Sequence, residues 1–297
     1  MAFLDKFYFH TWNIGFIEEE AKDIIAGGEK ELTVHWVKHP YKDRFFADPF
    51  ILSVDSNEIK VLVEDFPYYT KRGEISMLTI DRKTYELKQK TGVLSQPYHM
   101  SYPFILRKDE GVILVLPEAS QSGKLYYYTM NDETSMLENQ RVLMEESLLD
   151  STIVEFNNKW WLFCTKRGPA SNKDLYIYYS EKPEGPWHPH PNNPVITNEA
   201  MARPAGYFVK DESRLYRVIQ KCDRCYGEAV QISRVNKLTE YDYSETFIRT
   251  LELKKSEYSQ RFHTLNSLNG ISVVDGNRSS FSPARRVYYE IRNKLGL

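Results

Sequence analysis

The sequence contains no apolar segment long enough to cross a membrane. A spanning helix needs about 20 apolar residues, and a secretory signal needs an uninterrupted apolar core, whereas the chain opens with MAFLDKFYFHTWNIGF. We therefore expect a cytoplasmic protein. A surplus of basic residues is also missing, because 39 Lys and Arg stand against 41 Asp and Glu and give a net charge of -2. Without a concentrated basic face, a nucleic-acid partner is not expected.

Cysteine is scarce, and the metal and nucleotide motifs are incomplete. Cys164, Cys222 and Cys225 are too few, and odd in number, for a disulfide framework. Cys222 and Cys225 form a single CxxC without the second ligand pair that a zinc site requires. His188 and His190 likewise have no third ligand nearby. Because no GxGxxG or GxxxxGK loop is present either, we predict no metal and no bound cofactor.

Long helical periodicity is scarce as well, and short aromatic and β-branched segments take its place. Aromatic residues make up 14% of the chain, with 21 Tyr, a composition typical of strands. Four segments share one pattern: a polar or aromatic residue, a strand, a polar turn, and a second strand ending in a polar group. They are 46–64, 100–118, 148–166 and 201–220.

The spacing of these segments predicts the architecture. Their key residues are Asp48, Tyr102, Asp150 and Arg203, so the period is about 48 to 54 residues, and a further strand-like run follows each hairpin. That period suits a four-stranded propeller blade. A β-sandwich with fortuitous spacing is the alternative.

A fifth blade is expected to close the ring from both ends of the chain. Residues 263–275 supply two strands, and the segments beginning at Thr11 and Leu32 supply the third and fourth. Such closure removes open sheet edges. We therefore predict an all-β, five-bladed propeller over residues 1–280, followed by a basic helical tail over 281–297.

A propeller places the first residue of each inner strand, and the end of its hairpin partner, at the central axis. Burying many charged groups there without use would be costly, so the cluster indicates a site; mutually satisfied structural polar groups are the alternative. We add His99, just ahead of the second unit, as a substrate-binding residue. The residues expected at the axis are Asp48, Glu64, Tyr102, Glu118, Asp150, Lys166, Arg203, Gln220, His263 and Asp275.

The motifs FADPF, HMSYPFIL, LPEAS, LLDSTIVE with WWLF, SEKPEGPWHPHPNNP and ARPAGYF together resemble the N-terminal domain of glucosamine inositolphosphorylceramide transferase and its bacterial relatives. The resemblance runs in order from about Trp12 to Asp275. That domain is related to the five-bladed propellers of glycoside hydrolase family 43. The resemblance implies carbohydrate chemistry or carbohydrate binding.

In the hydrolase relatives three acids act together, and the resemblance assigns two of them here. Asp48 matches the base and Asp150 matches the residue that tunes a pKa, but Arg203 stands where the general acid Glu is expected. A guanidinium does not donate a proton at neutral pH. Ordinary hydrolysis needs two carboxyl groups flanking the bond, so Glu118 or Glu64 would have to supply the acid.

Three functions follow. Arg203 with Lys166 would hold an anionic leaving group such as a sugar-linked phosphate, which favours a glycosyltransferase-type enzyme in surface polysaccharide or glycolipid assembly. The alternatives are a furanosidase-like glycoside hydrolase with Glu118 as acid and a non-catalytic sugar-binding propeller. Because the plant relatives carry a separate transferase domain, we expect this propeller to act alone or with a partner enzyme. The tail ARRVYYEIRNKLGL would contact that partner or an acidic membrane surface.

Overall fold

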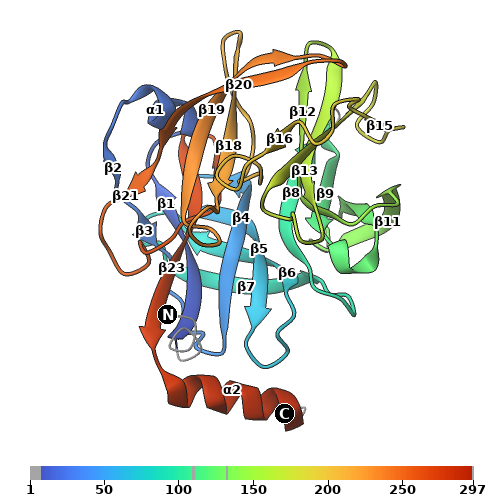
Figure 1. Ribbon diagram of the computed structural model, residues 1–297. Helices are drawn as coiled ribbons and strands as arrows, with labels where there is room; N and C mark the ends of the chain where they lie inside the picture. Colours follow the sequence, from blue (N-terminus) through green and yellow to red (C-terminus); the bar gives the residue numbers. More distant parts are fainter. Residues whose placement is uncertain (1–7, 109–110, 132, 296–297) are drawn as a thin grey trace.

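The computed structural model describes residues 8–108, 111–131 and 133–295, which form a five-bladed β-propeller (Figure 1). Each blade is an antiparallel sheet with four strands along its path, so the predicted architecture is confirmed. Neighbouring inner strands contact one another, since β4 touches both β8 and β22, and β8 touches β12. These contacts bring distant parts of the chain to one axis.

Blades one to four use consecutive strands. Blade one contains β4 (Arg44–Val54), β5 (Glu58–Pro67), β6 (Glu74–Asp81) and β7 (Leu87–Leu94). Blade two contains β8 (Ser101–Arg107), β9 (Ile113–Glu118), β10 (Leu125–Met130) and β11 (Leu137–Met144). Blade three contains β12 (Leu148–Phe156), β13 (Lys159–Lys166), β14 (Asp174–Ser180) and β15 (His188–Pro189), with β16 (Ile196–Thr197) also paired to β14. Blade four contains β17 (Val209–Asp211), β18 (Arg214–Lys221), β19 (Ala229–Leu238) and β20 (Tyr243–Thr250).

Blade five joins the two ends of the chain, as predicted. Its strand order is β22 (Leu265–Leu268), β23 (Ile271–Phe281), β1 (Tyr8–Ile17) and β3 (His35–Trp36). The long β1–β23 pairing runs from Tyr8 opposite Phe281 to Ile17 opposite Ser272. This pairing removes the open edge that β23 would otherwise present.

The outer part of blade five differs from the sequence expectation. We expected one strand from Leu32 onwards, but only His35 and Trp36 pair with β1. Leu32 belongs instead to β2 (Glu31–Leu32), which pairs in parallel with β21 (Glu252–Leu253). Two short helical turns, α1 (Ala21–Ala26) and η3 (Ser120–Ser122), were also not predicted.

One local irregularity recurs at the start of three inner strands. Asp48, Tyr102 and Asp150 each begin a bulge in which two residues oppose one on the next strand. All three have a left-handed backbone, with φ of 49°, 43° and 49°. Such a conformation costs a non-glycine residue about 1–3 kcal/mol and is concentrated at functional sites. The repeat in the sequence therefore corresponds to a repeated bulge and backbone conformation at Asp48, Tyr102 and Asp150.

Blade four departs from this pattern. The sequence predicted a strand from Arg203, which was wrong: the residue lies in a loop, and β17 begins only at Val209. Pro204 has no N–H to donate to a strand. Gly206 has φ of +138°, and a Cβ there would lie 2.2 Å from the carbonyl oxygen of Leu265. The chain pairs briefly with β18 on either side of Pro204, where the Gln220 N–H donates to the Arg203 carbonyl oxygen at 2.8 Å and the Ala205 N–H donates to the Val218 carbonyl oxygen at 3.1 Å. It then passes close to blade five at Gly206 before β17 begins.

Apolar side chains fill the spaces between blades. Ile14 and Phe16 of blade five pack with Phe46 and Val61 of blade one. A larger cluster joins the inner strands of blades one to three. In it the Phe50 ring contacts the rings of Tyr102 and Phe104 in β8. These contacts fix the angular position of each blade and so the geometry of the axis.

The helix α2 (Pro283–Leu295) follows β23 and lies at the end of the molecule where β1 begins (Figure 1). Its Tyr289 is buried against Phe9 and Tyr68, and the Tyr289 hydroxyl donates to the Lys42 carbonyl oxygen at 2.9 Å. The predicted tail helix is thus present and packed on the propeller. Among the described residues, no helix has the length and apolarity needed to cross a membrane.

The closure of blade five depends on close packing of Trp36, which gives a testable prediction. A Cβ on Gly276 would lie 2.2 Å from Cη2 of Trp36 and 2.4 Å from the carbonyl oxygen of Tyr258. We expect Gly276→Ala to lower the free energy of unfolding by about 1–3 kcal/mol, because overpacking forces neighbouring groups apart. Gly92→Ala is the control, since no atom lies within 4 Å of its added Cβ. Urea unfolding of both variants tests this, and equal stabilities would contradict the packing role.

Candidate functional site

The three bulges and the loop before β17 direct polar side chains towards the propeller axis. We call this group the hub. Every member has less than a tenth of its surface exposed, so its charges interact through a largely water-free interior. The members are Asp48, Glu64, Glu118, Asp150, Arg203, Gln220, His263 and Asp275.

Asp48 is the hub carboxyl group best placed to exchange a proton near neutral pH. Its oxygens accept hydrogen bonds from the Tyr102 backbone N–H at 3.2 Å and the Thr264 hydroxyl at 3.1 Å. Burial raises its pKa to about 7, and the negative charge of Asp150 adds to that effect, although His263 opposes it. A group with such a pKa is present in both protonation states at neutral pH.

His263 and Asp275 stand behind Asp48. The Asp275 carboxylate accepts the backbone N–H groups of Asp48, His263 and Thr264 at 3.0–3.1 Å. The same carboxylate lies 2.7 Å from His263 Nδ1, and His263 Nε2 lies 3.6 Å from Asp48. Burial lowers the pKa of His263, but Asp275 and Asp48 outweigh it and raise the pKa above its ordinary value. The carboxylates of Asp275 and Asp48 therefore favour the cationic form of the imidazole.

Within the described part of the chain, Asp48, His263 and Asp275 form a group that could bind a cation. The ligand atoms of Asp48, His263 and Asp275 all lie within 4.8 Å of one another. The oxygens of Asp275, however, already accept three backbone N–H groups. That saturation favours a hydrogen-bonded carboxylate over a metal ligand.

Asp150 and Arg203 form the second half of the hub. Arg203 Nε donates to Asp150 Oδ2 at 2.5 Å, and Gln220 donates to the same oxygen at 2.9 Å. Arg203 Nη1 donates to Asn172 at 2.9 Å, and the guanidinium lies 5.2 Å from the centre of the Tyr226 ring. The arginine that replaces the expected acid is thus held rigidly by the carboxylate of the neighbouring blade.

Glu64 lies beside His99, in surroundings that favour its protonated form. Burial raises its pKa well above the ordinary value, and the charges of Asp48 and Glu118 add to this shift. Its nearest basic group is His99, whose Nε2 lies 3.5 Å away. His99 Nδ1 accepts the Gly73 backbone N–H at 2.9 Å, so the neutral ring carries its proton on Nε2. Burial lowers the pKa of His99, which favours that neutral form.

Glu118 has a different environment. One oxygen accepts the Ser101 hydroxyl at 2.9 Å, and the other accepts the Ser120 backbone N–H at 2.8 Å. Both donors stabilise the ionised carboxylate. Of the two proposed acids, Glu64 therefore has the more suitable surroundings for holding a proton.

Two further predicted site residues lie outside the hub. Tyr102 is completely buried, and its hydroxyl bonds the Thr152 hydroxyl at 2.8 Å inside the core. Lys166 is partly exposed at the end of β13, where it pairs with Glu146 at 2.6 Å and covers the Tyr176 ring at 4.6 Å. Tyr102 therefore supports the hub from within, whereas Lys166 is held by Glu146 and Tyr176 rather than by the hub carboxylates.

Sequence reasoning missed several residues that contact the hub. Tyr226 is 41% exposed, packs beside Arg203, and contacts the His263 ring edge at 5.4 Å. Trp12 stacks on the other side of His263 at 4.3 Å. Tyr226 and Asn172 lie in loops between the second and third strands of their blades. Because such loops end beside the hub, a polar or aromatic residue at that place in the repeat was the available signal.

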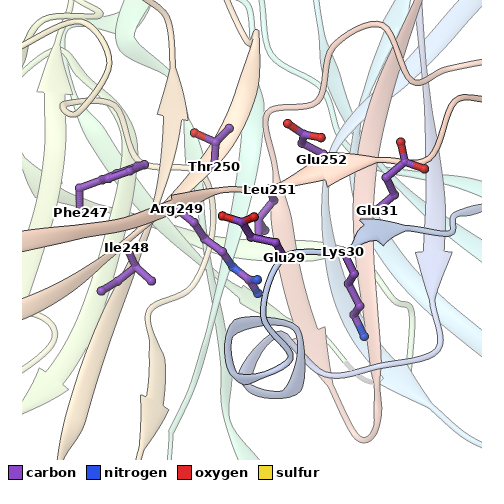
Figure 2. A pocket seen from close by; sticks show the side chains of 9 residues that line it. All are labelled: Glu29, Lys30, Glu31, Phe247, Ile248, Arg249, Thr250, Leu251 and Glu252. Atoms are coloured by element: carbon purple, nitrogen blue, oxygen red, sulfur yellow. The ribbon is translucent and has the colours of Figure 1, made fainter.

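A surface cavity of about 500 Å³ lies far from the hub, along β20, β21 and the segment before β2 (Figure 2). It contains three carboxylates and two cationic side chains, and Arg249 points away to bond the Ile24 carbonyl oxygen in α1. The lining residues are Glu29, Lys30, Glu31, Phe247, Ile248, Arg249, Thr250, Leu251 and Glu252. No hub residue contributes to it.

Comparison with known proteins gives one family match. The model of the family described as "Glucosamine inositolphosphorylceramide transferase 1, N-terminal" matches residues 32–276. Two curated proteins named glucosamine inositolphosphorylceramide transferase 1 are similar. The one from Oryza sativa subsp. japonica is 31% identical over 80% of this chain, and the one from Arabidopsis thaliana is 30% identical over 79%. The alignments span only 34% and 32% of those relatives.

A solved structure shows the same fold. A thermostable family-43 glycoside hydrolase superposes with a TM-score of 0.51 and 11% identity, over 73% of this chain and 78% of that one. This likeness shows that the propeller fold is shared with a family-43 glycoside hydrolase. At that identity it concerns the fold alone.

The buried ion pair gives a prediction about stability. Arg203→Met leaves the Asp150 carboxylate buried without its cation, so we expect a loss of about 3–5 kcal/mol in unfolding free energy. Adding Asp150→Asn should restore much of that loss, because the amide still accepts the Gln220 hydrogen bond. Lys237→Met is the control, since its pair with Asp242 is more than half exposed and contributes about 0–1 kcal/mol. An Arg203 effect no larger than that of Lys237 would exclude the structural role.

The raised pKa of Asp48 gives a prediction about pH. Between the unfolded value near 3.8 and the folded value of about 7, the native state holds a proton that the unfolded chain has released. Stability should therefore fall as pH rises through this window, by at most about 1.4 kcal/mol per pH unit from this group. Asp48→Asn removes that contribution, so its urea unfolding free energy should fall less steeply between pH 5 and 7. Identical slopes would show that Asp48 titrates normally.

Proposed function

Because the chain belongs to the glucosamine inositolphosphorylceramide transferase 1 N-terminal family, we propose that it is a carbohydrate-active protein whose hub transfers a glycosyl group from an anionic donor. The chain spans about a third of the length of the curated relatives it matches, so the transfer activity in their names is a proposal here. We place the reaction in the assembly of a surface polysaccharide or glycolipid.

The observation that carries this proposal is the position of Arg203 in the hub. Its Nε and Nη1 donate to Asp150 and Asn172. Among the described residues no acceptor engages Nη2, which is thus available to an anionic ligand. A fixed guanidinium stabilises phosphate charge well but supplies no proton. It suits a donor whose leaving group departs as phosphate.

Asp48 would act as the general base. In the proposed step the acceptor hydroxyl attacks the anomeric carbon, and its proton passes to Asp48. The bond from that carbon to the phosphate oxygen breaks, and its electron pair leaves on the phosphate, where Arg203 stabilises the charge. A pKa of about 7 matches a base that works near neutral pH, and His263, 3.6 Å away, would stabilise the ionised form that precedes the transfer.

The hydrolase alternative needs a proton donor. Glu64, whose pKa is raised well above its ordinary value by burial, is better suited to that role than Glu118, whose oxygens both accept hydrogen bonds. Hydrolysis would pair neutral Glu64 with Asp48 as base, across the sugar. The missing acid in blade four counts against this alternative.

A non-catalytic sugar-binding propeller is the second candidate, and one observation favours it. Asp150 and Arg203 neutralise each other at 2.5 Å, as mutually satisfied structural groups would. In that case the hub would position a glycan for a partner enzyme.

We also propose a cytoplasmic location for the protein. Three free cysteines support it, because free thiols are usual where the surroundings are reducing.

The decisive experiment is turnover with a panel of nucleotide sugars, scored by release of nucleoside phosphate that depends on an added glycan or lipid acceptor. Asp48→Asn should reduce that release by about 100-fold or more while the protein stays folded, because Asn tolerates the left-handed backbone at this position. Asp23→Asn, on the exposed face of α1, is the matched control and should be fully active.

The other outcomes separate the candidates. Release of free sugar from aryl glycosides, lost in Glu64→Gln or Glu118→Gln, would replace transfer by hydrolysis. Saturable sugar binding without turnover in either assay would favour the binding module. Full activity of Asp48→Asn would remove that residue from the mechanism.

A further inference from the structure

A second cavity, separate from the hub, has the composition of an anion site. It encloses about 600 Å³ between blade five and the segment that leads into blade one. Five cationic side chains line it, against one carboxylate, together with aromatic rings. The cationic residues are Lys38, Lys42, Arg44, Arg278 and Arg285, and the carboxylate is Glu257.

The cavity lies on the opposite side of β1 from the hub. Successive residues of a strand point to opposite faces. Trp12 stacks on His263 of the hub, whereas its neighbours Thr11 and Asn13 line the cavity. Blade five therefore separates the two sites, and a ligand in the cavity would not contact the catalytic residues proposed above.

Part of the positive charge is already balanced. Arg278 pairs with Glu257, and Arg44 bonds Asp65 at 3.1 Å and Asp43 at 3.1 Å. These ion pairs leave the two guanidinium groups in fixed positions on the cavity wall.

The remaining cations are Lys38, Lys42 and Arg285. Lys42 is exposed, and no ion pair among the described residues involves Lys42 or Arg285. The Arg285 guanidinium lies 4.2 Å from the centre of the Phe9 ring. Lys38 lies 3.8 Å from Glu86, and both side chains are about two-thirds exposed, so that pair contributes little. The cavity therefore holds a surplus of about two to three positive charges.

The backbone beneath Lys42 is held in place. Its carbonyl oxygen accepts hydrogen bonds from both the Arg285 guanidinium and the Tyr289 hydroxyl of α2. Through these hydrogen bonds, α2 holds Lys42 and Arg285, two of the uncompensated cations, at one edge of the cavity. On the other wall, His39 has a buried Nδ1 for which the described residues provide no hydrogen-bond partner.

Trp36 and Tyr258 complete the lining. Their ring centres lie 5.4 Å apart, and Trp36 Nε1 donates to Ser256 at 2.9 Å, which fixes the indole. Fixed aromatic rings beside cations suit a ligand that joins an anionic group to a flat or ring-shaped part. The cavity in Figure 2 lacks this character, because its three carboxylates outnumber its two cations.

From this composition we infer that this cavity, between blade five and the segment that leads into blade one, is a second binding site, for a phosphate ester. Lys42, Arg285 and Lys38 bind the phosphate, and Trp36 with Tyr258 contacts the group attached to it. Arginine and lysine together provide the charge-assisted hydrogen bonds that phosphate oxygens accept. The site does not depend on the transfer reaction proposed for the hub, and either can fail alone.

The ester can come from a soluble metabolite or from a lipid headgroup, and two probes distinguish them. The first is inorganic pyrophosphate, titrated calorimetrically into the full chain. The second is sedimentation with vesicles of 80% phosphatidylcholine and 20% phosphatidylinositol 4-phosphate, compared with pure phosphatidylcholine. Binding in either assay should weaken as salt is added, because the attraction is electrostatic.

Lys42→Glu is the test variant, because it reverses a charge on an exposed side chain without removing a buried contact. We expect at least a tenfold loss of affinity in whichever assay shows binding. Lys182→Glu, an equally exposed change in blade three, is the matched control and should bind like the original protein. Thermal unfolding confirms that both variants are folded.

Each result decides the question. Lys42-dependent binding of pyrophosphate supports a site for soluble phosphate esters, and Lys42-dependent binding to the phosphoinositide vesicles alone supports a site for lipid headgroups. Binding that Lys42→Glu leaves unchanged, as expected if Arg203 in the hub were the anion site, overturns the inference. So does an equal loss in Lys182→Glu, or the absence of saturable binding to both probes.

Discussion

The convergence of five carboxyl groups on an axis that excludes water is the constraint on which the rest of the structure depends. Asp48, Glu64, Glu118, Asp150 and Asp275 are each less than a tenth exposed, and that many buried negative charges cannot coexist uncompensated. In the propeller, each carboxyl group is stabilised by different neighbouring groups. Arg203 pairs with Asp150, backbone N–H groups bind Asp275, and the pKa values of Asp48 and Glu64 are raised.

These different surroundings give the hub carboxyl groups different pKa values. Asp48 has a pKa of about 7 because burial is only partly offset by His263, while burial and acidic neighbours raise the pKa of Glu64 well above its ordinary value. Carboxyl groups with pKa values pushed apart can divide the roles of acid and base. Arg203 adds a fixed positive charge at a place where the hydrolase relatives are expected to have an acid. This fixed charge is the feature on which the proposed transfer from an anionic donor rests.

Closure of the ring links the hub to the surface of the molecule. The β1–β23 pairing brings both ends of the chain into blade five, whose two faces serve different purposes. Trp12 supports His263 on one face, and Thr11 and Asn13 line the cationic cavity on the other. The helix α2 then packs across the end of this blade and orients Lys42 through its carbonyl oxygen.

The sequence by itself determined the blades, because alternating apolar residues and polar turns recur at a period set by four short strands. It also determined that Asp48 and Asp150 reach the hub, since they occupy one place in the repeat. Only the tertiary structure decided what each residue does there. Tyr102 faces the core, Lys166 pairs with Glu146, and Leu32 leaves blade five for β21. Pairing partners, protonation and the cationic cavity arise from contacts between segments far apart in the chain, which no local pattern encodes.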